Sequence, residues 1–291
     1  TIALEWMHDT FKDAPLLGSL LNPAKSPLPM EVRWEEIQPL LEQALNQEKS
    51  PEEDQTIQQE VAVVAQGLAK ASTLLAGKYQ WVITNVPYLA RGKQNGRLRD
   101  FCEKYYSAAK NDLATVFLDR CLELCVQGGT SSIVLPQNWL FLTSYKKFRE
   151  KLLKNDTWHL IARLGPGAFE TISGEVVKAI LISLSRGNST KESGGLFGDV
   201  NDGNLIRGVD VSEPRTASEK AAQLMAADIK SVEQVKQLEN PDARVAFDDV
   251  QGDLLEDYAI SYKGITTGDD PKYRRKFWDF EQVNDEFRLF Q

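Results

Sequence analysis

The stretch Tyr79–Tyr88, which reads YQWVITNVPY, decides how the rest of this chain is interpreted. Its first six residues are mostly aromatic or β-branched, which is typical of a β-strand. Asn85 and Pro87 then end the strand, because proline donates no backbone hydrogen bond and restricts the preceding residue to extended geometry. The stretch therefore predicts a strand that stops at a polar turn.

Further strands and helices alternate downstream of this turn. Strand-like runs lie at 130–135, 158–164 and 176–184, and helical patterns at 112–126, with Gly128-Gly129 as its C-cap, and at 143–153. This alternation predicts an α/β sheet with helical crossovers. The close spacing of the last two strands predicts an antiparallel hairpin at one edge of the sheet. Additional helical patterns occupy 31–47, 56–75 and 214–240, and polar, Gly-containing stretches predict loops at 91–99 and 187–204.

Composition excludes several classes of protein. The 291 residues are 42% hydrophobic and 26% charged, which is typical of a globular chain of about two domains. No apolar run approaches the ~20 residues that cross a bilayer. The net charge of −8 argues against a strong nucleic-acid clamp, and three sparse cysteines favour a reducing cytoplasm over a disulfide framework. Since Thr1 is not a methionine, we expect the chain to be part of a longer protein.

Two strand ends concentrate the candidate chemistry, because open α/β sheets bind ligands at the carboxyl ends of their strands. They are Asn85–Tyr88 and Pro136–Trp139. At the first, the Asn85 side-chain oxygen and the Val86 carbonyl offer two acceptors beside the flat face of Tyr88. That combination suits a planar ligand with an amino group. The alternative is an ordinary strand-to-loop turn, in which Asn and Pro are common.

The surrounding order of motifs resembles one known family. Asn85-Val-Pro-Tyr88, Lys110-Asn-Asp-Leu113, Pro136-Gln-Asn-Trp-Leu140 and Leu164-Gly-Pro-Gly-Ala-Phe169 follow one another as in the methyltransferases that modify the N6 amine of adenine in DNA. The resemblance is to the restriction-modification and phage-defence branch. It covers about residues 16–186 and is clearest over 79–185. The family motif is Asn/Asp-Pro-Pro-Tyr/Phe, so Val86 is the departure.

The resemblance implies roles for individual residues. Asn85 and the Val86 carbonyl would accept hydrogen bonds from the amine, Pro87 would restrict Val86, and Tyr88 would stack on a flipped adenine. Phe169 lies where the family places a second aromatic ring against the base. The basic loop after the motif, with Arg91, Lys93 and Arg97, would contact DNA phosphates.

The resemblance also implies a fold, a cofactor and partners. The fold would be a Rossmann-like S-adenosylmethionine-dependent sheet, incomplete on its N-terminal side, with residues 1–76 as a helical segment and insert. Residues 77–212 would form the catalytic core. Residues 213–291 would form a helical connector and the start of a target-recognition region, since Tyr262–Asp270 resembles the segment leading into it. Double-stranded DNA is the implied partner, with a recognition or nuclease region fused or separate.

The sequence contains few candidate residues for binding the expected cofactor, S-adenosylmethionine. Asn85 and Pro87 belong to the implied cofactor site, and Gly18 resembles part of its wall. However, no strand with a Gly-rich turn precedes Asn85. Two explanations stay open: the first strands lie outside this chain, or Leu164–Phe169 is the cofactor loop of a circularly permuted enzyme.

Two other functions stay open as well. The same sheet could be a non-catalytic module that binds DNA or a partner subunit, or the same chemistry could act on RNA bases or glutamine amides. The acidic residues Asp248, Asp249, Asp253, Glu256 and Asp257 lack the spacing of a metal site, so we expect no metal.

Overall fold

The computed structural model describes residues 2–25, 67–168, 177–187 and 204–247. The chain divides into two compact units, Thr1–Phe247 and Asp248–Gln291, and every described residue belongs to the first. The predicted helix at 31–47, most of that at 56–75, and Phe169 lie outside the described residues; 67–76 is helical.

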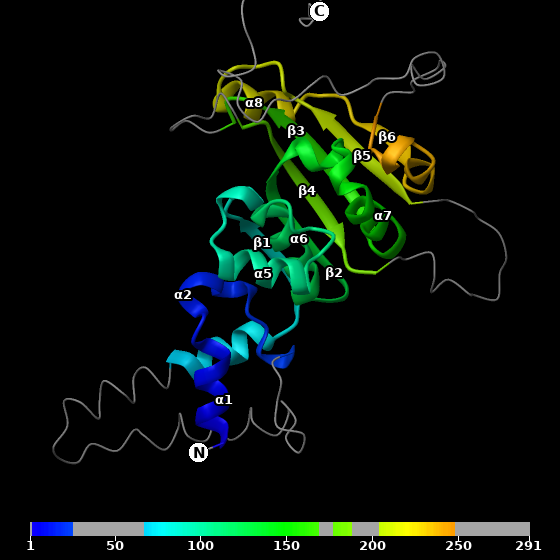
Figure 1. Cartoon of the computed structure of the whole chain (residues 1–291). Helices are drawn as coiled ribbons and strands as arrows, with labels where there is room; N and C mark the ends of the chain where they lie inside the picture. Colours follow the sequence, from blue (N-terminus) through cyan, green and yellow to red (C-terminus); the bar gives the residue numbers. More distant parts are fainter. Residues whose placement is uncertain (1, 26–66, 169–176, 188–203, 248–291) are drawn as a thin grey trace, which may run out of the picture. The chain divides into compact units, whose positions relative to one another are not determined.

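Six strands form one mixed sheet in the order β1-β2-β4-β3-β5-β6 (Figure 1). Their bounds are β1 Tyr79–Asn85, β2 Cys125–Pro136, β3 Thr157–Gly165, β4 Ala179–Ser185, β5 Leu205–Asp210 and β6 Lys230–Glu233. β1 and β2 are parallel, as are β3 and β5, whereas β4 is antiparallel to both of its neighbours. The α/β class and all four predicted strands are confirmed.

The position predicted for the antiparallel hairpin is wrong. β3 and β4 do pair antiparallel, but β4 lies between β2 and β3, and β5 and β6 extend the sheet beyond β3. The hairpin is therefore central within the described sheet. β5 and β6 are short, and 214–240 is helical only in α8 (Ala217–Leu224) and a 3-10 turn at Val235–Leu238. The predicted boundary at residue 212 falls between β5 and β6 of this sheet.

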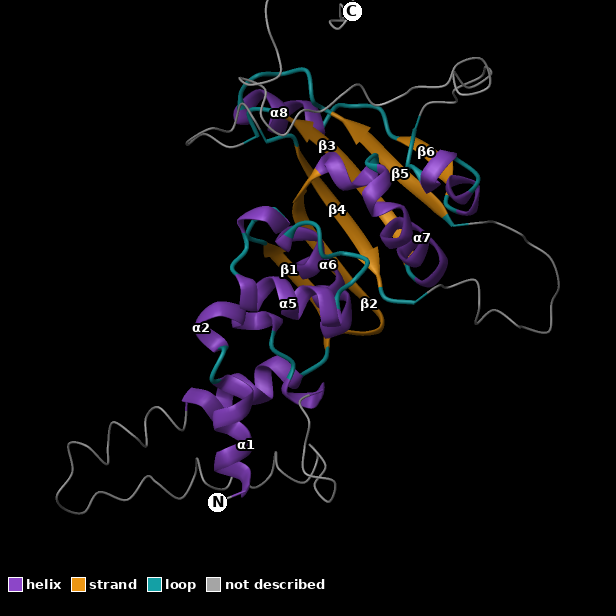
Figure 2. Cartoon of the chain, viewed as in Figure 1, coloured by secondary structure: helices purple, strands orange, loops and turns teal. Residues whose placement is uncertain are grey.

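α5 (Gly96–Tyr105), α6 (Leu113–Leu124) and α7 (Lys146–Asn155) lie on one side of the sheet (Figure 2). Leu224 of α8 packs against a separate small cluster of Ala162, Val209 and Val211. The N-terminal part of the chain contributes α1 (Ile2–Phe11) and α2 (Ala14–Leu17).

Two details differ from the sequence-based expectation. α6 ends at Leu124, and Gly128-Gly129 lies inside β2 rather than at a helix C-cap. Glycine is needed there because a Cβ on Gly129 would lie 2.8 Å from the Tyr79 carbonyl oxygen. The predicted loop at 91–99 contains the start of α5, whose first turn is capped by Asn95.

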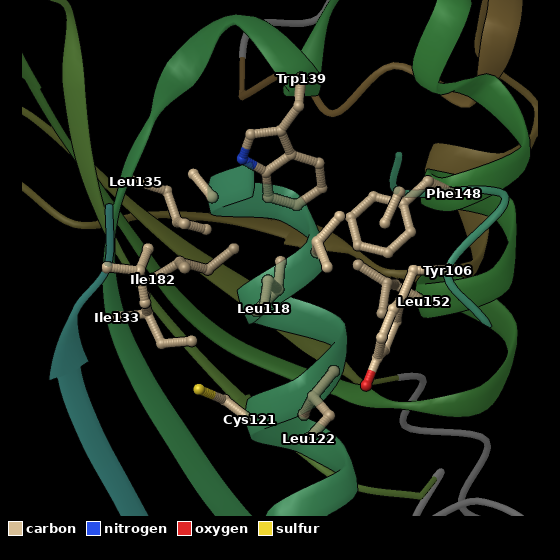
Figure 3. Close-up of a cluster of buried hydrophobic side chains, with 14 of the residues drawn as sticks. Tyr106, Leu118, Cys121, Leu122, Ile133, Leu135, Trp139, Phe148, Leu152 and Ile182 are labelled. Atoms are coloured by element: carbon tan, nitrogen blue, oxygen red, sulfur yellow. The ribbon is translucent and has the colours of Figure 1, made fainter. Parts of the chain in front are cut away.

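The main core lies between the sheet and α6 and α7 (Figure 3). The ring of Trp139 lies 5.7 Å, centroid to centroid, from the rings of both Phe148 and Trp158. Leu118 of α6 and Leu135 of β2 are fully buried beside them. Because Trp139 lies three residues after Pro136, the last residue of β2, this packing fixes where that strand end lies.

Candidate functional site

A cavity of about 590 Å³ opens where β1 and β2 end. Parallel strands place their carboxyl ends at one edge of a sheet, and both predicted strand-end motifs contribute to the lining. The lining residues are Tyr88, Leu89, Ala90, Lys93, Asp112, Pro136, Gln137, Asn138, Phe141, Leu142, Val177 and Lys178. Tyr88 of the first strand end and Pro136, Gln137 and Asn138 of the second thus line one cavity.

The motif residues divide between core, surface and cavity. Asn85 pairs in register with Val134, its side chain is exposed, and no hydrogen bond joins that side chain to another described residue. Val86 is only 6% exposed and packs into the core. Tyr88, three residues after Asn85, is half-buried and lines the cavity. Asn85 itself does not line it.

Asp112 fastens the segment after the motif to the start of α6. Its Oδ1 accepts hydrogen bonds from the backbone N–H groups of Leu89 (3.3 Å) and Ala114 (2.9 Å), so it caps the helix and holds the loop together. The Leu89 carbonyl accepts from Leu113 N at 3.0 Å, and Ala90 forms an antiparallel bridge with Asp112. The position of Tyr88 is therefore set by the helix that follows 25 residues later in the chain.

Tyr88 lines the cavity and also packs against the residues of the main core. The hydroxyl oxygen is buried and has no hydrogen-bond partner among the described residues. Burial, and to a lesser extent the charge of Asp112, raises the pKa of Tyr88 to about 12. The phenol therefore stays neutral at physiological pH and can act as an aromatic surface, not as a base.

A buried arginine fixes the backbone of the residues that follow β2 in the cavity wall. The Arg149 guanidinium donates to the carbonyls of Trp139 (2.5 Å) and Leu142 (2.8 Å), and also to those of Asp242 and Ala243. Arg149 is fully buried and burial lowers its pKa, but the nearby carboxylate of Asp242 opposes that effect. The residues that follow β2 are thus tied to α7.

The three basic residues expected to contact phosphate have different partners and surroundings. Lys93 lines the cavity. The guanidinium of Arg91 pairs with Glu103 at 2.6 Å, and that of Arg97 pairs with Asp13 at 2.6 Å beside a second cavity of about 400 Å³. Gly18 adopts a positive φ of 50° and lines neither cavity, although Leu17 and Leu20 line the second.

Among the lining residues, Asp112, Phe141 and Lys178 were given no site role from the sequence. Gln137 and Asn138 belong to the strand end 136–139 that the sequence marked, since they follow a buried strand that ends in proline. Lys178 is brought there by β4, and no local pattern in the sequence marks it.

Before β1, the described ranges 2–25 and 67–78 contain helices and turns but no strand with a Gly-rich turn. No described strand pairs with the outer edge of β1, and on one face of this strand Trp81 is 65% and Ile83 73% exposed. Over the same described ranges, no group of three His, Cys, Asp or Glu side chains is placed to bind a metal ion.

The mixed sheet and its helices define an α/β protein with a cavity where two parallel strands, β1 and β2, end. Its sequence matches the Eco57I restriction-modification methylase profile over residues 17–169, which is more than half of the chain. The chain belongs to that family.

Curated relatives carry related names. Over 113 residues the chain is 38% identical to "Adenine-specific methyltransferase PglX" of Lacticaseibacillus casei (strain Zhang), covering 38% of this chain and 9% of the relative. It is 39% identical over 105 residues to "Adenine-specific methyltransferase BrxX" of Escherichia coli O9:H4 (strain HS), covering 36% and 9%. It is 30% identical over 114 residues to "Type I restriction enzyme EcoEI methylase subunit" of Escherichia coli, covering 38% and 22%. The chain thus spans a small part of the length of these relatives. Among its described helices, none is both long and apolar enough to span a membrane.

Proposed function

We propose that this chain supplies the base-binding side of an enzyme that transfers a methyl group from S-adenosylmethionine to the N6 amine of a flipped adenine in DNA. The observation that carries the proposal is the cavity that Tyr88 and the end of β2 form immediately beyond Asn85. Family membership and the names of the relatives support the same reaction.

The residue types fit the difficulty of the reaction. The amine of adenine is a poor nucleophile because its lone pair is delocalised into the ring. Acceptors at Asn85 Oδ1 and the Val86 carbonyl would bind the two N–H groups and stabilise the positive charge that develops as the methyl group arrives. Such electrostatic stabilisation is commonly worth about 3–4 kcal/mol per group. Val in place of Pro at position 86 is compatible with this role, since the acceptor is a backbone carbonyl.

Tyr88 would hold the base once it has left the duplex. Extrusion costs a few kcal/mol, and stacking on an aromatic ring offsets about 1–3 kcal/mol of it. The raised pKa of Tyr88 agrees with a neutral stacking surface. Phe169 is proposed as a second stacking ring, and Pro87 as the residue that fixes the direction of the Val86 carbonyl.

The methyl donor supplies an electrophilic methyl group when bound, and its remaining contacts are proposed to come from outside the described residues. Asn85, Pro87 and Gly18 are the residues of this chain proposed to lie near it. Lys93 is the strongest candidate for a phosphate contact, because Arg91 and Arg97 already pair with carboxylates. Double-stranded DNA is the proposed partner, with target recognition in the region that begins near residue 262. The three free, buried cysteines support a cytoplasmic setting.

The test is to supply the intact enzyme with methyl-labelled S-adenosylmethionine and to offer DNA, RNA and protein as acceptors. Label in DNA, recovered as N6-methyladenine after digestion, is the expected result. Label in RNA or protein instead would reassign the substrate. Saturable DNA binding without any transfer would support a non-catalytic binding module.

A further inference from the structure

Gln137 is the first residue beyond β2, and it lies in the wall of the cavity that is proposed to bind adenine. Its backbone N–H donates to the Lys178 carbonyl at 2.8 Å, which fixes the backbone at this point. The following residues, Trp139 and Leu140, are buried in the core and leave little freedom to the turn. The side chain of Gln137 therefore projects from a rigid support.

The hydrogen-bonding capacity of this side chain is unused. Oε1 of Gln137 is buried and has no partner in the described structure, and no described residue is joined to its amide by a hydrogen bond. Because Oε1 is buried, a ligand in the cavity can reach only the donor atom Nε2, which forms no hydrogen bond with a described residue.

We propose that Gln137 is a specificity residue that donates a hydrogen bond from Nε2 to a ring nitrogen of the adenine next to its amine; this rests on the proposed function. The amine has only two hydrogens, and Asn85 and Val86 are proposed to accept both. The ring nitrogens N1 and N7, which flank the amine, are acceptors and still lack a donor. An amide donor beside them completes recognition of the adenine edge, because it supplies the donor that a ring nitrogen lacks.

Thymine and guanine fit this arrangement less well. Both carry a carbonyl where adenine carries its amine, so they would face the acceptors at Asn85 and Val86 with another acceptor. Gln137 thus adds discrimination through the ring nitrogen, whereas the two acceptors discriminate through the amine.

The test uses the full 291-residue chain and short single-stranded oligonucleotides, so that no duplex has to open. One heptamer carries a single adenine among thymines, two carry 1-deazaadenine or 7-deazaadenine in its place, and one contains thymine only. Binding is measured by fluorescence anisotropy for the wild type and Gln137→Leu. Gln223→Leu is the matched control, since Gln223 on α8 also has a buried, unpartnered oxygen but lies outside both described cavities.

The wild type and Gln223→Leu are expected to lose about five-fold in affinity when one of the two ring nitrogens is replaced by carbon, the effect of one hydrogen bond. Gln137→Leu should bind the adenine heptamer about five-fold more weakly than the wild type, with no further loss for either analogue. An equal penalty for the analogues in Gln137→Leu and the wild type would overturn the inference. The inference would also be overturned if the wild type binds both deaza heptamers as tightly as the adenine heptamer while still preferring adenine to thymine. If no protein prefers adenine to thymine, the proposed adenine seat fails together with this inference. A change in binding through misfolding would not remove the analogue penalty selectively, and the thermal unfolding curve of each variant checks for it.

Discussion

Asp112 holds Leu89 in place across 23 residues of sequence: its Oδ1 accepts the Leu89 N–H at 3.3 Å while also capping α6 through Ala114 N at 2.9 Å. One carboxylate oxygen therefore joins the residue after Tyr88 to the helix that packs on the sheet. The position of Tyr88 in the proposed adenine-binding site depends on these two hydrogen bonds of Asp112.

Replacing Asp112 by Ala should lower the free energy of unfolding by about 1–2 kcal/mol, the usual effect of losing a helix N-cap. Asp112→Asn should lose less, because its side-chain oxygen still accepts. Both are measured by urea denaturation. Amide exchange at Leu89 and Ala90 should accelerate in Asp112→Ala and much less in Asp112→Asn; equal protection in Asp112→Ala and the wild type would show that the link does not hold the loop.

Tyr88 should tolerate removal of its hydroxyl but not of its ring. Tyr88→Phe keeps the aromatic face and removes an oxygen that has no partner in the described structure, so adenine binding should change less than two-fold, within RT. Tyr88→Ala removes the stacking surface and should weaken binding by at least about five-fold, since stacking contributes about 1–3 kcal/mol. The heptamer titration described above measures both. Equal losses in the two variants would assign the role to the hydroxyl instead.

Arg149 should be among the most sensitive positions for stability. Arg149→Ala leaves four carbonyls without their donor, two of them in buried and two in part-buried hydrogen bonds, so we expect a loss of more than about 3 kcal/mol in unfolding free energy. Arg149→Lys retains the charge but cannot reach four acceptors with one ammonium group, and should lose an intermediate amount. Chemical denaturation gives both values. A loss of unfolding free energy below about 1 kcal/mol for Arg149→Ala would mean that water readily takes the place of the guanidinium as the donor to these carbonyls.

Asp156 makes stability depend on pH. Its carboxyl group is 8% exposed, and burial raises its pKa to about 6, although the Gly187 N–H at 3.1 Å works in the opposite direction. A raised pKa in the folded state means that the protonated form is favoured by folding. The stabilisation that the protonated Asp156 side chain gives to the folded state is therefore complete below pH 3.8, the ordinary pKa of the group. It is lost as the pH rises to about 6.

Asp156→Asn should consequently stabilise the protein at pH 8 by roughly 1–3 kcal/mol and have little effect at pH 3.5. The asparagine oxygen can still accept from Gly187 N. Thermal unfolding of the two proteins across pH 3.5–8 measures the difference. A gain that does not vary with pH would assign the effect to packing rather than to the charge.

The parts of the fold that local patterns determine were predictable. β1 and the end of β2 contain apolar and β-branched residues and stop at Asn85 and Pro136, and α6 has apolar residues at helical spacing. The convergence of the two strand ends follows from parallel topology.

The parts that depend on long-range contacts were not predictable. β5 contains Gly208, a poor strand former, and glycine is needed because a Cβ there would lie 2.4 Å from the ring of Phe247. The ion pair between Arg97 and Asp13 joins residues 84 positions apart, so nothing near Arg97 indicated that its charge is already paired. The same holds for Lys178, which reaches the cavity only because β4 lies next to β2.

Asn85 tests the central claim most directly. In the intact enzyme, Asn85→Ala removes an exposed side chain without a hydrogen bond to any described residue, so the thermal unfolding midpoint should stay within a few degrees of the wild type. Transfer of labelled methyl groups to DNA adenine under single-turnover conditions should fall by about 100-fold or more, since one acceptor of the developing charge is lost. Turnover retained near the wild-type rate in a folded Asn85→Ala protein would contradict the account.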